Sequence, residues 1–308
     1  MMRGETMNKL VLLASVFSLL FTISCKRDDK LGSENNPIKL YFTPSVDADT
    51  IASNSTDFLQ FLEKETGYFF KSGIPTNYIS VVEAFGSARA DIGVMNSFGY
   101  IMANEKYGAS AKLKVIRHGH DYYQGQIIAH VDSGIESIKD LEGKKFAFTD
   151  PSSTSGYMFP LKIMKEAKVN PSNKTFAIKH DNVVTMVYQK QVDAGATYYS
   201  APDENGKIRD ARARVKTQFP DVEEKVKIIK TTEKIPNDPF VFRKDLPKEI
   251  TDKFIAAVKK YIATEKGKTV FKNIYSVGGL VDATDADYDG LRNMIKEINI
   301  NIEEQLSK

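Results

Sequence analysis

The chain has 308 residues, of which 42% are hydrophobic and 27% charged, and its formal net charge is +3. This length and apolar content are enough for one or two globular domains with a buried core, which excludes an intrinsically disordered chain. The small net charge, with no basic block interleaved with aromatic residues, excludes a protein built to bind nucleic acid.

The N-terminal segment has the pattern of a secretory signal peptide. Lys9 precedes residues 10–23, an apolar segment without a charge. The segment is too short for a bilayer-spanning helix but has the length of a signal-peptide core, so we predict a signal peptide over residues 1–24. Met1 and Met7 are both possible start residues, and a start at Met7 gives the shorter basic segment before the apolar segment.

Cys25, the only cysteine, follows the apolar segment after one residue, Ser24. A single cysteine cannot form an internal disulfide. Its position resembles that of the lipidated cysteine of bacterial lipoproteins, although Thr22 and Ile23 differ from the residues usual there. We predict a lipid on Cys25 and a flexible polar tether over residues 25–36, with plain cleavage or a short anchor as alternatives. The protein would then lie in the cell envelope (periplasmic), anchored to a membrane by its lipid alone.

Strand-like and helix-like segments alternate along the rest of the chain. Strands are predicted at residues 38–43, 68–70, 91–95, 114–118, 126–130, 144–149, around 176, and at 193–196, 226–230 and 240–242. Helices are predicted at residues 56–66, 77–85, 97–107, 157–168, 182–189, 248–264, 268–275 and 287–303. This alternation indicates an α/β fold with βαβ units around mostly parallel sheets.

The segment from Asp150 to Tyr157 carries the strongest functional signal. It joins a predicted strand to a predicted helix and contains four consecutive hydroxyl residues, Ser152 to Ser155, closed by Gly156. One hydroxyl is enough to cap a helix. Further hydroxyls beside the free N–H groups of a helix N-terminus indicate a binding site for an oxyanion. The alternative is a helix cap in a surface turn that contains more hydroxyl residues than capping requires.

The same segment, with Pro160 after it, closely resembles the signature of the phosphate, phosphite and phosphonate substrate-binding proteins of ABC importers. Residues 235–239 and 285–288 resemble later motifs of that family, so the resemblance covers about residues 38–290. It implies a monomeric binding protein that closes over a small phosphorus oxyanion and delivers it to an ABC permease and its ATPase. Phosphate, phosphite and phosphonate all remain open as the native ligand.

The resemblance also implies a type II periplasmic binding protein fold, in which two crossover segments join two lobes and the ligand cleft lies between them. We expect residues 37–120 and 236–308 to form lobe 1 and residues 121–235 to form lobe 2. Ligands of α/β sheets bind beyond the carboxyl ends of the strands, which places the site between the lobes.

Strand ends and resemblance together predict the binding residues. They are Ser153, Thr154, Ser155, Gly156, Tyr78, His180, Asn96, Ser97, Thr43 and Tyr198. For Tyr78 the alternative is a tyrosine that supports the sheet, and for His180 a structural hydrogen-bonding role. Consecutive residues of a strand face opposite sides, so at most one of Tyr198 and Tyr199 faces the ligand, and Tyr198 is the one we prefer.

Other chemistries find less support. His118, His120 and His130 match no standard zinc spacing, so no metal and no cofactor are expected. Ser153 lacks the elbow motif of a hydrolase nucleophile, so we expect no catalytic residue. A ligand-binding receptor for a membrane sensor and an envelope phosphoesterase are the alternative functions.

Overall fold

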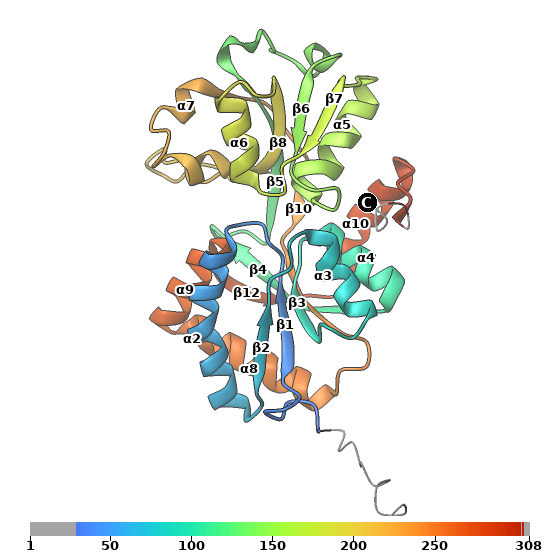
Figure 1. The fold of residues 1–308 in the computed structure, drawn as a ribbon, viewed down its shortest axis with the longest axis vertical. Helices are drawn as coiled ribbons and strands as arrows, with labels where there is room; N and C mark the ends of the chain where they lie inside the picture. The colour runs from blue at the N-terminus through green and yellow to red at the C-terminus, as the bar shows by residue number, and fades with distance from the viewer. Residues whose placement is uncertain (1–28, 303, 305–308) are drawn as a thin grey trace, which may run out of the picture.

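The computed structural model describes residues 29–302 and residue 304. The predicted signal peptide and Cys25 lie outside these residues. Two α/β lobes stacked end to end make up the described part, as Figure 1 shows, and the two-lobed α/β fold predicted from the sequence is confirmed.

The strands and helices follow the predicted alternation. The strands are β1 (Ile38–Phe42), β2 (Phe70–Gly73), β3 (Ile92–Val94), β4 (Ser110–Arg117), β5 (Tyr122–His130), β6 (Lys145–Phe148), β7 (Asn173–Phe176), β8 (Ala194–Tyr199), β9 (Val226–Thr231), β10 (Ile235–Pro236), β11 (Pro239–Phe242) and β12 (Val277–Asp282). The α-helices are α2 (Ala48–Thr66), α3 (Tyr78–Gly86), α4 (Ser97–Tyr107), α5 (Phe159–Ala167), α6 (His180–Tyr188), α7 (Val222–Lys225), α8 (Lys248–Ala263), α9 (Glu265–Tyr275) and α10 (Asp289–Glu297). Short helical turns are η1 (Val131–Ser133), η2 (Ile138–Leu141), η4 (Ala211–Val215) and η5 (Asp285–Tyr288), and η3 (Thr154–Met158) is a π-helix.

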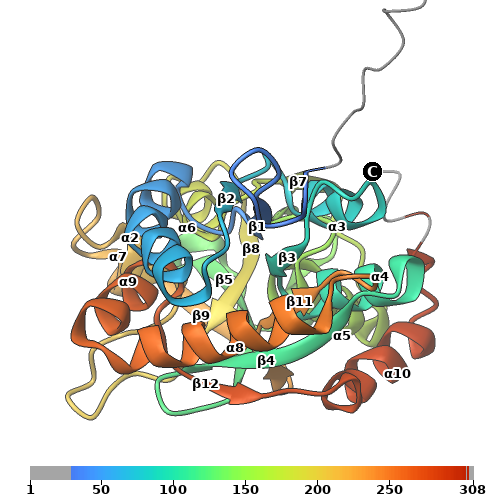
Figure 2. The same cartoon turned by 90° about the horizontal axis from the view of Figure 1, so that it is seen from below.

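The first lobe is built on a six-stranded sheet with the order β12-β4-β11-β3-β1-β2. β1 runs parallel to β2 and β3, while β11 pairs antiparallel with both β3 and β4. Viewed from below in Figure 2, α2, α8 and α9 lie on one side of this lobe and α3 and α4 on the other. The carboxyl ends of β1 and β3 point toward the second lobe.

The second lobe is built on the order β10-β5-β8-β6-β7, with β9 pairing with β5. β6 is parallel to β7 and β8, and β5 is antiparallel to β8. The chain crosses between the lobes from β4 to β5 and again from β10 to β11, close to the waist in Figure 1.

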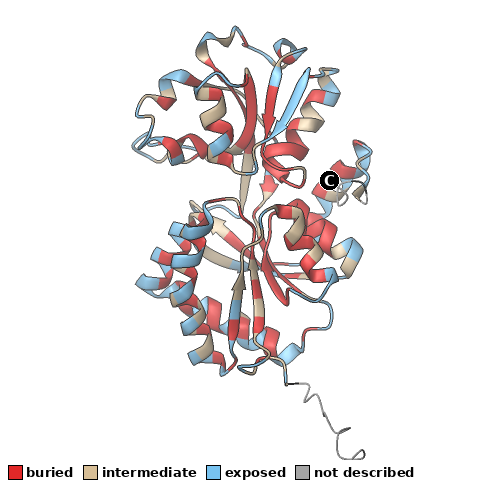
Figure 3. Ribbon diagram, in the orientation of Figure 1, coloured by how far each residue is buried: buried red, intermediate tan, exposed pale blue. Residues whose placement is uncertain are grey.

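Alternate residues of the strands pack on opposite faces of each sheet. In β1, Ile38, Leu40 and Phe42 are buried against α2, α8 and α9, while Tyr41 contacts the cluster on the α3 and α4 face. That second cluster continues into the other lobe, where it includes Phe148 and residues of α5. Figure 3 shows the buried residues concentrated on the strands and on the inward helix faces of both lobes.

The structure adds helix and strand residues that the sequence analysis does not predict. The segment expected to be a loop up to residue 54 is helical from Ala48, because Ser53 and Asn54 bond back to helix carbonyls and Ile51 reaches the core. Strand β12 was not predicted, and its two central glycines conceal the apolar alternation.

The predicted tether extends too far along the chain. Leu31 packs against the first lobe, Gly32 accepts a hydrogen bond from the Phe69 N–H at 2.9 Å, and Ser33 pairs with Asn36. Residues 31–36 are therefore part of the folded body, and only the residues before them remain for a tether.

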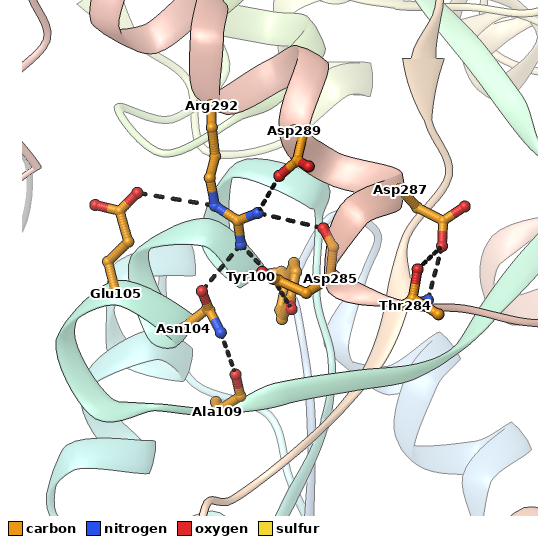
Figure 4. A network of polar contacts seen from close by, with 9 residues as sticks. All are labelled: Tyr100, Asn104, Glu105, Ala109, Thr284, Asp285, Asp287, Asp289 and Arg292. Carbon is orange, nitrogen blue, oxygen red and sulfur yellow. Dashed lines mark hydrogen bonds and ion pairs between the residues drawn. The ribbon is translucent and has the colours of Figure 1, made fainter.

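The C-terminal helix α10 is fastened to α4 by an arginine cluster, drawn in Figure 4. Arg292 forms ion pairs with Asp285 and Asp289 and donates to the Asn104 side chain at 2.9 Å. The Tyr100 hydroxyl donates to the same Asp285 carboxylate. Beyond α10, the Ile298 carbonyl accepts from Lys165 of α5 at 2.7 Å, so the C-terminal segment contacts both lobes.

Between residues 29 and 302, none of the helices combines the length and the apolar content that crossing a bilayer requires.

Candidate functional site

A cavity of about 710 Å³, counted with its opening to solvent, lies between the two lobes. Most of the predicted binding residues line it, namely Thr43, Tyr78, Asn96, Ser153, Ser155, His180 and Tyr198. Ser97, Thr154 and Gly156 do not. The loops that end β1 and β3 of the first lobe therefore face the turn after β6 of the second lobe.

The Asp150 carboxylate shapes the turn after β6. It accepts hydrogen bonds from the Ser152 N–H at 2.8 Å and hydroxyl at 2.7 Å, and from the Tyr78 N–H of the other lobe at 3.4 Å. Burial raises the pKa of Asp150, and these hydrogen bonds partly oppose that rise. Ser152 is thus used by the turn itself and does not line the cavity.

Ser153 caps the π-helix η3. Its hydroxyl oxygen accepts from the Gly156 N–H at 3.1 Å, which leaves the hydroxyl proton for another acceptor. The first N–H groups of such a helix, those of Thr154 and Ser155, have no intrahelical acceptor. A local π-helix is often found at functional sites. The turn therefore presents both hydroxyl and backbone donors.

Gly156 is required by packing rather than by ligand approach. A Cβ atom at this position would lie 2.2 Å from the hydroxyl oxygen of Thr149, the residue that follows β6. The glycine lets the turn pack closely against the end of β6. The sequence analysis predicted instead that Gly156 contacts the ligand.

Thr154 joins the lobes. Its hydroxyl oxygen accepts from the Phe98 N–H at 2.9 Å and donates to the Asn96 side-chain oxygen at 3.0 Å, and the residue is fully buried. Ser97 is also engaged elsewhere, because its hydroxyl donates to the Pro236 carbonyl. Both residues act at the junction of the lobes, away from the cavity wall.

Asn96 and Tyr78 present donors that the protein does not use. The Asn96 side-chain oxygen accepts from both Gly99 N–H and Thr154, so its amide NH₂ is left for the cavity. The Tyr78 side chain is 2% exposed, and its buried hydroxyl has no hydrogen-bond partner among the described residues. By contrast, Thr43 donates its hydroxyl proton to the Val94 carbonyl at 3.0 Å and has no proton to offer.

His180 lies at the N-terminus of α6 and is neutral. Its Nδ1 lies 2.8 Å from the Thr197 hydroxyl and 3.2 Å from the Thr149 hydroxyl. Burial, together with the nearby Arg214 and Arg117, lowers the pKa of His180 to about 3. The sequence suggested a donor that could become cationic, and burial prevents that at physiological pH.

Tyr198, not Tyr199, reaches the cavity. Its ring packs edge-on against His180 with the centroids 5.0 Å apart, and its hydroxyl accepts from the Arg214 Nε at 2.8 Å. Strand alternation allows only one of the two tyrosines to face the cavity, and Tyr198 is the one that does.

Three cavity arginines escaped the sequence analysis. Arg117 ends β4 and forms a 2.6 Å ion pair with Asp238, while its Nε donates to the Tyr275 carbonyl. Arg209 precedes the helical turn η4 and Arg214 lies within it, in a part of the chain where no element is predicted. Only the fold brings these side chains to the site, and no motif marks them.

Three more ring side chains that the sequence analysis did not predict line the cavity, those of His118, Tyr123 and Tyr275. Burial and then the charge of Arg209 lower the pKa of His118, so this imidazole also favours the neutral form. Burial raises the pKa of Tyr123, whose hydroxyl lies beside Ser155. Across the part of the chain that the structure describes, no three His, Cys, Asp or Glu side chains are placed to hold a metal ion.

Comparison with known proteins gives a consistent family. Residues 40–288 match the family model described as the periplasmic substrate-binding protein of ABC phosphonate transporters. The chain is 26% identical to the phosphate-import protein PhnD of Mycolicibacterium smegmatis, with 95% of this chain and 97% of that protein covered. It is 23% identical to the phosphonates-binding periplasmic protein of Escherichia coli, with 87% and 79% covered.

The fold agrees with a solved structure as well. A binding protein component of an ABC phosphonate transporter from Pseudomonas aeruginosa superposes with a TM-score of 0.74 at 21% identity. The match covers 88% of this chain and 92% of that one.

Proposed function

Because the chain belongs to the family of periplasmic substrate-binding proteins of ABC phosphonate transporters, we propose that its cavity captures a small phosphorus oxyanion for an ABC permease and its ATPase. The family is one of transport proteins and not of enzymes. The observation that carries the proposal is the buried Tyr78 hydroxyl, which lines the cavity and is without a partner among residues 29–302. A buried polar group of this kind is costly unless something pairs with it, and an oxyanion would do so.

The neighbouring groups support the same ligand. The hydroxyls of Ser153 and Ser155, the Asn96 amide and the open N-terminus of η3 are all donors, and none of them carries a full charge. The carboxylate in the wall, Asp238, is paired with Arg117 and so repels an anion less. Uncharged donors hold an oxyanion by hydrogen bonds and also allow its release to a permease.

A calorimetric panel on the full chain in mild detergent tests this function. We expect micromolar or tighter binding of at least one of phosphate, phosphite and methylphosphonate, with a generic aryl phosphate left unhydrolysed. Binding of none of the three oxyanions would refute the proposed function, and turnover of the aryl phosphate would favour the phosphoesterase alternative.

We also propose that a lipid on Cys25 holds the folded body at a membrane surface in the cell envelope. The support is the short apolar segment that ends at this only cysteine. Cys25→Ala is expected to leave the precursor uncleaved or to move the protein from the detergent phase to the aqueous phase on phase partitioning. A cleaved variant that still partitions into the detergent phase would contradict the lipid anchor.

A further inference from the structure

Two cavity arginines have no acidic partner. Arg209 takes part in no hydrogen bond or ion pair with the described residues, and Arg214 donates only to the Tyr198 hydroxyl, its guanidinium lying 5.7 Å from the centre of that ring. Four other arginines form ion pairs: Arg117 with Asp238, Arg212 with Asp210, Arg243 with Asp91, and Arg292 with Asp285. The cavity wall therefore has three arginines to one aspartate, and neither Arg209 nor Arg214 forms an ion pair with the described residues. Asp203 and Asp181 act on these two arginines only through space, without direct contact.

The local fold holds these two arginines toward the cavity. Between them, Asp210 is buried and accepts from the Arg212 N–H at 2.9 Å and from its guanidinium at 3.0 and 2.8 Å. Arg212 in turn donates to the Val226 carbonyl at 2.9 Å. Asp210 therefore points into the protein, where Arg212 neutralises its charge, while Arg209 and Arg214 line the cavity. The arrangement is preorganised for an anion.

The uncharged donors and the two arginines suit different parts of a ligand. Ser153, Ser155, Tyr78 and Asn96 supply hydrogen bonds for one oxyanion without any added charge. Solvent reaches Arg209 and Arg214. A ligand that displaces water from their guanidinium groups must therefore replace the hydrogen bonds that this water makes with them. A guanidinium pairs best with a planar or tetrahedral anion, and it repels an ammonium group.

Resting on the proposed function, we propose that the native ligand carries a second anionic group, a carboxylate or another phosphoryl group, which Arg209 and Arg214 bind. The ligand class is then an anionic phosphonate or phosphate ester with an acidic tail. Alkylphosphonates without a charged tail, and aminoalkylphosphonates, would fit less well.

Calorimetry on the full chain in mild detergent tests this with four probes: methylphosphonate, phosphonopropionate, ethylene bisphosphonate and aminoethylphosphonate. We expect at least one of the two acidic-tailed probes to bind roughly tenfold or more tightly than methylphosphonate, and aminoethylphosphonate to bind no better than methylphosphonate. The probe that binds more tightly distinguishes a carboxylate from a phosphoryl tail.

The double variant Arg209→Gln/Arg214→Gln locates the effect. It should abolish the advantage of the acidic tail and change methylphosphonate affinity by less than about threefold. The matched control is Arg89→Gln, which removes an exposed arginine outside the cavity wall and should leave all affinities unchanged. Equal binding of methylphosphonate and both acidic probes, or an advantage that survives the double variant, would overturn the inference and leave the proposed function standing.

Two other outcomes are also decisive. A comparable loss of methylphosphonate affinity in the double variant would place the arginines at the first oxyanion and refute a second anionic group. Failure of all the phosphorus probes, with phosphate and phosphite also inactive, would refute the proposed function and the inference with it.

Discussion

Tyr78→Phe is expected to weaken oxyanion binding by roughly ten- to a hundredfold and to leave the free energy of unfolding unchanged or about 1 kcal/mol higher. The hydroxyl has no partner in the described part of the protein, so removing it sacrifices nothing that stabilises the fold. A hydrogen bond to a charged oxyanion contributes about 1.5–3 kcal/mol, which sets the size of the loss in affinity. Calorimetry with the best ligand of the panel and chemical denaturation measure the two quantities.

Tyr261→Phe is the matched control for this variant. The Tyr261 hydroxyl is also buried and without a partner among the described residues, but its ring packs between α2 and α9 in the core of the first lobe. This variant should keep full affinity. Equal affinity of wild type and Tyr78→Phe would place the oxyanion elsewhere in the cavity.

Thr154→Val is expected to lower affinity by at least about tenfold without removing a group that lines the cavity. Valine keeps the shape but leaves the Phe98 N–H unpaired when the lobes meet, at about 1–3 kcal/mol, and it removes one of the two hydrogen bonds that the Asn96 oxygen accepts. The closed arrangement is thereby destabilised. Small-angle scattering should show a larger radius of gyration for the ligand-free variant than for wild type.

Thr66→Val separates this effect from the loss of any buried hydroxyl. Thr66 also donates and accepts, to the Leu62 carbonyl at 2.7 Å and from the Tyr68 N–H at 3.2 Å, but within one lobe. It should lower the free energy of unfolding and leave both affinity and radius of gyration unchanged. An unchanged affinity in Thr154→Val would mean that the contact does not control closure.

The features that sequence could predict are the local ones. The hydroxyl residues and the glycine of the turn after β6 identify it in the sequence. The hydrophobic patterns of the strand before it and of the helix after it locate its ends to within a few residues. Asn96 could be placed because it follows the end of a strand, and strand alternation allowed only one of Tyr198 and Tyr199 to face the cavity. In each case the deciding residues are neighbours in the chain.

The features that could not be predicted depend on pairing across the fold. The hydroxyl of Thr154 looks the same in sequence as that of Ser155, and only the approach of α4 shows that it joins the lobes. Arg209 and Arg214 lie in a segment without periodicity, where the inward turn of Asp210 determines which charges face the cavity. Strand partners such as that of β9 follow from tertiary contacts and not from the strand's own residues.

The C-terminal segment bears on how quickly a bound ligand can leave. Two crossover segments alone would let the lobes swing about one axis, but α10 lies to the side of the waist (Figure 1). There α10 contacts α4 of the first lobe, and Ile298, the residue after it, contacts α5 of the second lobe. Met294 and Ile295 belong to the same apolar cluster as Met164 of α5. Full separation of the lobes must break or slide this lateral contact, which adds to the activation barrier for opening. The residence time of the complex is therefore expected to depend on a helix that does not line the cavity.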